Sequence, residues 1–152
     1  MSESKRPSLA SGISYRDPRA ALRWLKAAFG FETMMVVENE DGTIGHSEMR
    51  FGNGLVMVGR EWDAHHKSPA SVEGVNTQSI HVQLETGLDA HCERARAAGA
   101  VITREPADQF YGDRIYAAVD PEGHVWTFGQ TNRTMTIEEM SKAGGVSVRE
   151  RL

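Results

Sequence analysis

Residues 111–130, YGDRIYAAVDPEGHVWTFGQ, place a tight turn between two segments rich in aromatic and β-branched residues. The turn is Asp120-Pro121-Glu122-Gly123, in which the proline fixes φ and the glycine permits a positive φ. The flanking segments, Arg114–Val119 and His124–Gln130, therefore predict two antiparallel strands. This hairpin decides the fold because its pattern occurs twice in the chain.

An earlier hairpin, MRFGNGLVMVG at residues 49–59, has the spacing of VDPEGHVWTFG at residues 119–129. Two helix-like segments, DPRAALRWLKAAFG and LDAHCERARAAG, end at Gly30 and Gly99. The helix and the hairpin recur in the same order at nearly the same offset. The sequence therefore predicts two copies of one structural unit.

Each copy predicts a strand, a helix and then three strands. In the first copy, Asp17 is suited to cap a helix that begins at Pro18, and Gly30 is suited to end it. The strands expected around this helix are 8–15, 31–38, 43–51 and 55–60. In the second copy, a helix at 88–98 is expected among strands at 79–84, 100–104, 114–119 and 124–130.

These elements divide the chain into five parts. We expect a flexible N-terminus at residues 1–7, a first module at 8–60, a linker at 61–77, a second module at 78–130 and a C-terminal tail at 131–152. The two modules together form one domain, 8–130. Thr136-Ile137-Glu138-Glu139 has the pattern of a capping box, which predicts a short helix in the tail.

Composition restricts the partners of this chain of 152 residues. The formal net charge is −4 and there is no extended basic cluster, so we expect no nucleic-acid partner. No apolar stretch has the length of a membrane span, and no signal-peptide pattern occurs, so we expect no membrane partner. The single cysteine, Cys92, fits a cytoplasmic location and a buried position on its helix.

With the repeat established, the sequence resembles the vicinal oxygen chelate superfamily of glyoxalases, bleomycin-resistance proteins and dioxygenases, and its bleomycin-resistance-like or PhnB-like branch in particular. The stretches that carry the resemblance are YRDPRAALRWLKAAFGFE, HSEMRFGNGLVMVGRE, LDAHCERARAAGA and YGDRIYAAVDPEGHVWTFGQ. The resemblance implies an α+β fold of two βαβββ modules, whose curved mixed sheets surround a cavity with the helices outside. It also implies a homodimer.

Strand alternation predicts which side chains face that cavity. We expect the apolar positions to face the helices, among them Ile80, Val82, Ile115 and Ala117. On the last strand, the resemblance implies that Trp126 and Phe128 face the helices and Thr127 faces the cavity. The opposite, polar positions then face the cavity. The predicted ligand-binding residues are His46, Glu48, Arg50, His81, Gln83, Tyr111, Arg114, Tyr116 and Thr127.

The resemblance also implies where a metal ion would bind in metal-dependent members. The ligand positions, on the first and fourth strands of each module, fall near Ala10, Met57, Ser79 and Thr127. None of these side chains is a good ligand for a divalent cation, so we expect no metal cofactor. The alternative is a displaced site formed by His46, Glu48 and His81, which would hold one divalent metal such as Zn, Ni, Mn or Fe.

These expectations leave three functions open, of which the third is a structural or regulatory module with a vestigial pocket. The first is a metal-free protein that binds a small molecule in a polar and aromatic cavity. The second is a metal-dependent, glyoxalase-like lyase or isomerase, or a dioxygenase-type enzyme, that uses the displaced site. For Arg114, a ligand-binding role and an ion pair with an inward acid such as Glu48 are equally favoured.

Overall fold

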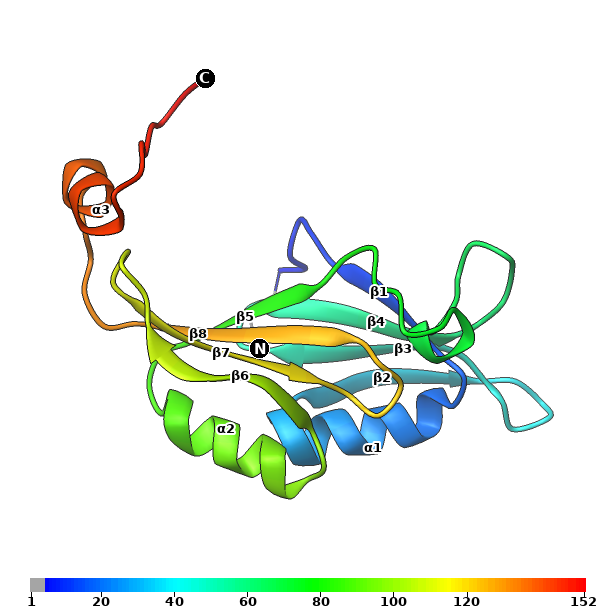
Figure 1. The fold of residues 1–152 in the computed structure, drawn as a ribbon. Coiled ribbons are helices and arrows are strands. Elements are labelled where there is room, and N and C mark those ends of the chain that lie inside the picture. The colour runs from blue at the N-terminus through cyan, green and yellow to red at the C-terminus, as the bar shows by residue number, and fades with distance from the viewer. Residues whose placement is uncertain (1–4) are drawn as a thin grey trace.

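The computed structural model describes residues 5–152, so the first four residues of the predicted flexible N-terminus lie outside it. Two modules follow in chain order (Figure 1). The first contains β1 (Ser11–Tyr15), α1 (Pro18–Phe29), β2 (Glu32–Glu38), β3 (Ile44–Phe51) and β4 (Gly54–Arg60). The second contains β5 (Ile80–Leu84), α2 (Leu88–Ala97), β6 (Val101–Asp108), β7 (Asp113–Val119) and β8 (Val125–Thr131).

The predicted helix signals of the first module are confirmed. The side chain of Asp17 accepts a hydrogen bond from the backbone N–H of Ala20 at 3.0 Å, and Pro18 is the first helical residue. Gly30 ends α1 with φ of 83°, a left-handed conformation that glycine adopts without steric cost. Local sequence thus sets both ends of α1.

Each module forms one four-stranded mixed sheet, in the order β1-β4-β3-β2 or β5-β8-β7-β6. The first strand of each module pairs in parallel with the fourth, and the other pairs are antiparallel. The predicted α+β class with two equivalent modules is therefore confirmed.

The helix-covered faces of the two sheets contribute to one continuous core. At its centre, the ring of Phe29 from α1 lies 5.3 Å from that of Trp126 and 4.7 Å from that of Phe128 on β8. Phe31 also contacts Trp126, at 5.5 Å between ring centroids. The predicted core position of Trp126 is confirmed, and the opposite faces of the two sheets, here called the open faces, point away from this core.

Asp120, in the turn between β7 and β8, joins the two modules. Its carboxylate accepts hydrogen bonds from the hydroxyl of Tyr15 on β1 at 2.7 Å and from the indole N–H of Trp126 at 3.1 Å. It also accepts from the backbone N–H groups of Glu122 and His124, both at 3.0 Å. Asp120 is only 4% exposed, so this one residue shapes the turn and satisfies buried donors of both modules.

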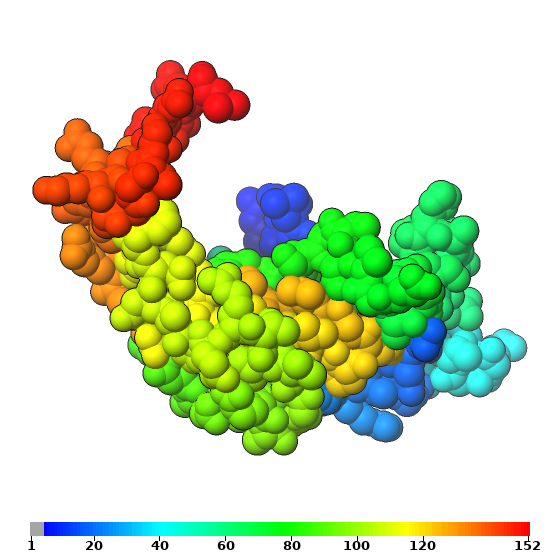
Figure 2. Space-filling view, in the orientation of Figure 1, coloured from blue at the N-terminus to red at the C-terminus, as the bar shows by residue number. Residues whose placement is uncertain are grey.

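Beyond the sheets, the segment at 61–77 contains a short 3₁₀ helix, η1 (Pro69–Ser71), and the tail contains α3 (Ile137–Gly144). The predicted capping box is present, with hydrogen bonds in both directions between Thr136 and Glu139. Figures 1 and 2 show α3 and the residues after it standing out from the body of the molecule. Within residues 5–152, no helix is long and apolar enough to span a membrane.

Candidate functional site

On β7, the structure reverses the predicted facing of alternate residues. Tyr116 lies directly opposite Phe128 in the β7–β8 ladder, and Ala117 lies opposite Thr127. Directly opposite residues of an antiparallel pair share a face, so Tyr116 faces the core with Phe128. The prediction that Arg114 and Tyr116 face a cavity, with Ile115 and Ala117 toward the helices, was therefore wrong.

Tyr116 is fully buried, and its hydroxyl lies 2.6 Å from Nδ1 of His91 on α2. The Nε2 atom of His91 lies 2.8 Å from the carbonyl oxygen of Phe29, at the end of α1. The carbonyl can only accept, so Nε2–H donates to it and Nδ1 accepts from the tyrosine hydroxyl. Burial raises the pKa of Tyr116 and lowers that of His91. His91 thus joins both helices to β7.

Arg114 binds two acids on the helix side of the second sheet. Its guanidinium donates to Asp89 of α2 at 2.8 Å and to Asp108 of β6 at 3.1 Å. The pKa of Asp89 is lowered, chiefly by the hydrogen bond from Arg114. Of the two roles left open for Arg114, the structure contains the ion pair, but its partners are not Glu48.

The open face of the second sheet carries a row of four hydrogen-bonded polar side chains, here called the polar ladder: Thr127, His81, Gln83 and Thr131. The Nδ1 atom of His81 lies 2.7 Å from Oγ1 of Thr127, and its Nε2 atom lies 3.1 Å from Oε1 of Gln83. The amide nitrogen of Gln83 donates to Oγ1 of Thr131 at 2.9 Å. Both ring nitrogens of His81 are therefore engaged, with Nε2–H as donor and Nδ1 as acceptor in the neutral ring.

Gly129 makes room for the polar ladder. A Cβ atom at this position would lie 2.9 Å from Cε1 of His81 and 3.1 Å from Oε1 of Gln83. Gly129 pairs with Gln83 on β5, so the two long side chains lie across the backbone of β8 where it has no side chain. The absence of a side chain is the requirement at this position, because the backbone of Gly129 has no positive φ.

Strand register also corrects the predicted metal-ligand positions by two residues. Two ligands of one module must lie side by side, and the neighbour of Thr127 on β5 is His81, not Ser79. In the first module, the neighbour of Met57 on β1 is Gly12, not Ala10. One of the four positions thus carries an imidazole, while Gly12, Met57 and Thr127 remain unsuited to bind a divalent cation.

The open face of the first sheet holds a separate ion cluster around Glu48 on β3. The guanidinium of Arg6 donates to both carboxylate oxygens of Glu48, at 2.8 and 3.1 Å, and Nε2 of His46 lies 3.2 Å from one of them. Arg50, the next residue of β3 on this face, instead pairs with Glu32 of β2 at 2.8 Å. Hydrogen bonds, first from Arg6 and then from His46, lower the pKa of Glu48 to about 2.

The alternative metal site is not assembled within one chain. His46 and Glu48 lie on β3 of the first sheet, whereas His81 lies on β5 of the second sheet. Among the residues that the structure describes, no three His, Cys, Asp or Glu side chains are grouped so as to hold a metal ion. The prediction of a His46, Glu48 and His81 site in a single chain was therefore wrong.

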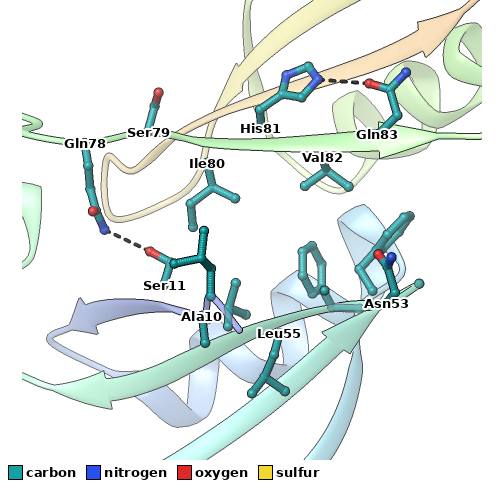
Figure 3. A pocket seen from close by; sticks show the side chains of 16 residues that line it. Ala10, Ser11, Asn53, Leu55, Gln78, Ser79, Ile80, His81, Val82 and Gln83 are labelled. Carbon is teal, nitrogen blue, oxygen red and sulfur yellow. Dashed lines mark hydrogen bonds between the residues drawn. The ribbon is translucent and has the colours of Figure 1, made fainter. Parts of the chain in front are cut away.

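A cavity of about 610 Å³ lies between β5 and the turn that joins β3 to β4. Its apolar lining includes Phe31, Phe51, Leu55, Ile80 and Val82. Figure 3 shows Ile80 and Val82 on the side of β5 that faces Leu55, with the hydrogen-bonded pair His81 and Gln83 on the other side of the strand. The lining of the cavity therefore combines apolar side chains with polar groups that include two members of the polar ladder.

Polar groups line the end of this cavity near β1, where the amide nitrogen of Gln78 donates to Oγ of Ser11 at 2.9 Å (Figure 3). Tyr111, the remaining predicted ligand-binding residue, lies in the β6–β7 turn with its ring 5.2 Å from that of Phe110. It does not line this cavity.

Two residues of these sites were missed in the sequence. Arg6 was assigned to the flexible N-terminus, and nothing in its local sequence indicates a partner 42 residues away. Gly129 was noted only as the end of the repeated hairpin. A glycine inside a strand often marks a place where other groups approach the backbone closely. Gly129, two residues after inward-facing Thr127, could have been recognised as such a place.

Comparison with known proteins finds a family model and a relative that each match most of the chain. Residues 9–128 match the model of the Glyoxalase/Bleomycin resistance protein/Dioxygenase superfamily. An uncharacterized protein of Mycobacterium tuberculosis is 29% identical over 141 residues, which cover 90% of this chain and 82% of that protein.

Among solved structures, TioX from Micromonospora sp. ML1 is similar with 33% identity and a TM-score of 0.65, over 86% of this chain and all of TioX. TnmS3 from Streptomyces sp. CB03234, described as an antibiotic binding protein, has 14% identity and a TM-score of 0.62, over 80% of this chain and 93% of TnmS3. At that identity, the likeness to TnmS3 is one of fold.

Proposed function

Because the chain belongs to the Glyoxalase/Bleomycin resistance protein/Dioxygenase superfamily, we propose that it binds a small organic molecule without a metal ion, in the cavity between β5 and the β3–β4 turn. The observation that carries this proposal is the polar ladder. His81, the neighbour of Thr127 on β5, carries the imidazole that a metal ion could use. Both of its ring nitrogens already have hydrogen-bond partners within the protein. A metal ion would have to break one of these bonds and would gain no second ligand from Thr127.

The shape and chemistry of the cavity support the same function. About 610 Å³ lies within the usual range for a small-molecule site, which is roughly 300 to 1,000 Å³. Phe31, Phe51 and Leu55 offer contact to a planar apolar group, and His81 and Gln83 at the border offer hydrogen bonds to a polar substituent. The ligand that fits best is therefore a planar or zwitterionic compound with one apolar face.

The exposed apolar side chains of β2 support a homodimer as the form that binds. Met35 and Val37 of β2 are 41% and 46% exposed, and β2 is an edge strand of the first sheet. A second copy packed along this edge strand would remove its apolar side chains from water. Light scattering on the purified protein gives the mass that tests this part of the proposal.

The test uses protein treated with EDTA and a panel of planar aromatic and zwitterionic antibiotics, chosen because TnmS3 is an antibiotic binding protein. A binder raises the midpoint of thermal unfolding by an amount that grows with the logarithm of its concentration relative to Kd. Leu55→Trp should fill the cavity and abolish this stabilisation, whereas Val101→Ala, at a side chain that is 62% exposed and does not line the cavity, should retain it.

The opposite result would favour the enzyme. Stabilisation only after addition of a divalent metal, together with turnover of the compound, contradicts metal-free binding. If the Leu55→Trp variant also showed this metal-dependent stabilisation and turnover, the ligand would in addition bind outside this cavity.

A further inference from the structure

The carboxylate of Glu48 lies in a row of uncharged positions across the open face of the first sheet. Its directly opposite neighbours are Met35 on β2 and Met57 on β4, and Met57 in turn lies beside Gly12 on β1. A Cβ atom added at Gly12 would meet nothing within 4 Å, so the row is open at that end. A charged group in such a row needs a counter-ion, because neighbouring thioethers cannot replace its hydration.

The sheet itself supplies no cation to Glu48. Arg50, two residues along β3 on the same face, is paired with Glu32. His46 donates from Nε2 to Oε1 of Glu48, and this bond leaves Oε2, the second carboxylate oxygen, for another donor. The strands therefore present a carboxylate with one hydrogen-bond donor and room for a cation.

That cation is Arg6, which precedes β1 and lies outside any helix or strand. Its two parallel hydrogen bonds to Glu48 have the fork geometry that guanidinium forms with carboxylate. The Glu48 side chain is only 7% exposed, while that of Arg6 is 66% exposed, so the guanidinium covers the acid from the solvent side. Within the part of the chain that the structure describes, residues 5–10 form no other side-chain hydrogen bond.

We propose that Glu48 and His46 form a binding subsite for an organic cation, a guanidinium or a primary ammonium group, and that Arg6 occupies this subsite as an internal competitor. The subsite is distinct from the cavity beside β5, and its ligand class follows from the group that the protein itself places there. An external guanidinium would form the same two hydrogen bonds and release residues 5–10 from the open face. A primary ammonium would form fewer, because it lacks the fork.

The internal competitor has a measurable consequence. A group tethered to the same chain acts at an effective concentration in the millimolar range, so it weakens an external ligand of similar intrinsic affinity. Removing Arg6 should therefore raise the apparent affinity for an external guanidinium by about tenfold or more. The gain should depend on Glu48, because the carboxylate is the shared partner.

The experiment titrates N-ethylguanidinium, and then ethylammonium, into four variants by NMR, following the side-chain carboxyl carbons. The variants are wild type, Arg6→Ala, Arg6→Ala with Glu48→Gln, and Arg50→Ala. The last is a matched control, because it frees Glu32, an exposed acid on the same sheet, from its own arginine. Circular dichroism checks that each variant is folded.

The proposal predicts that Arg6→Ala binds N-ethylguanidinium about tenfold more tightly than wild type, with the shift at Glu48, and binds ethylammonium more weakly. Adding Glu48→Gln should remove this binding, and Arg50→Ala should show no gain. Equal binding by wild type and Arg6→Ala, retention of binding without Glu48, or an equal gain in Arg50→Ala would each overturn it. None of these outcomes depends on whether the cavity beside β5 binds a ligand.

Discussion

The hydroxyl of Thr127 lies 2.7 Å from Nδ1 of His81, its register partner on the adjacent parallel strand. The family resemblance implied metal-ligand positions near Ser79 and Thr127, and the strand register places His81, not Ser79, beside Thr127. Here the second position carries a hydroxyl, which is a poor ligand for a divalent cation and a good donor to a neutral imidazole. The pair therefore forms part of a hydrogen-bonded surface.

Gly129→Ala should disturb this surface. The added methyl group would meet His81 at 2.9 Å and Gln83 at 3.1 Å, so both side chains must move. We expect the imidazole nitrogen signals of His81 to change in long-range ¹H–¹⁵N spectra. The free energy of unfolding should fall by only about 1 kcal/mol, the net contribution of a lost hydrogen bond, because both side chains are exposed and can move away. Gly59→Ala, at the corresponding position of β4, is the control, because its added methyl group meets nothing within 4 Å. Equal effects of the two substitutions would contradict the role assigned to Gly129.

Tyr116→Phe should weaken the fold and leave ligand binding unchanged. The substitution removes the donor to Nδ1 of His91 and leaves that acceptor half-buried without its partner, which costs about 1 to 2 kcal/mol. Chemical denaturation measures the loss, and the thermal-shift response to any compound that binds wild type measures the site. A selective loss of binding, with stability intact, would return Tyr116 to the ligand-binding surface.

Asp120→Ala should be more damaging than the loss of any other turn acid. Two buried donors, on Tyr15 and Trp126, and two backbone N–H groups lose their acceptor together. We expect the free energy of unfolding to fall by about 3 kcal/mol. Asp41→Ala is the comparison, since Asp41 lies exposed in the β2–β3 turn, where its carboxylate accepts hydrogen bonds from the backbone N–H and the hydroxyl of Thr43. A similar small loss in both variants would show that Asp120 does not join the modules.

The Arg6–Glu48 pair predicts a specific dependence of stability on pH. The pKa of Glu48 is lowered from its ordinary 4.5 to about 2 in the folded protein. A carboxyl whose folded pKa is depressed stabilises the fold above its unfolded pKa, and this contribution is lost as the pH falls toward the folded value. Wild type should therefore lose more stability than Glu48→Gln between about pH 4.5 and pH 2.

Thermal unfolding of both proteins across this pH range measures the difference. Other acids with lowered pKa values, such as Asp89 and Glu105, are present in both proteins and cancel in the comparison. Parallel pH profiles for the two proteins would mean that Arg6 does not hold Glu48 in solution.

The fold was predictable because its signals are local and repeated. Asp17 and Gly30 mark the ends of α1 by their own backbone preferences, and the two glycine-terminated hairpins indicate the repeat without any knowledge of tertiary contacts. Cys92 was correctly expected to be buried, since its position on the helix stripe follows from spacing alone.

The side chains of β7 that point toward the core were harder to predict, because both faces of this strand are largely apolar. Alternation allows either assignment for Ile115 and Tyr116, and the polar ends of the strand favoured the wrong one. The length of the β7–β8 turn determines the register of the two strands. Because Val119 lies opposite Val125, Tyr116 must lie opposite Phe128. Once Phe128 is assigned to the core, Tyr116 must follow it.

The ion cluster around Glu48 was beyond sequence reasoning for a different reason. Arg6 and Glu48 are far apart in the chain, and Arg6 lies in a segment without secondary structure, where no periodicity assigns a direction to its side chain. Contacts of this kind depend on the path of the segment over the finished sheet. Such paths follow from tertiary structure alone.

The most direct test of metal-free binding is an NMR titration of ¹⁵N-labelled, EDTA-treated protein with the panel of planar and zwitterionic antibiotics. The account predicts that at least one compound causes saturable shifts at Ile80–Gln83 and at the β3–β4 turn, with no change when EDTA is replaced by zinc, nickel, manganese or ferrous iron. Shifts at these residues that occur only when one of the metals is present would contradict it.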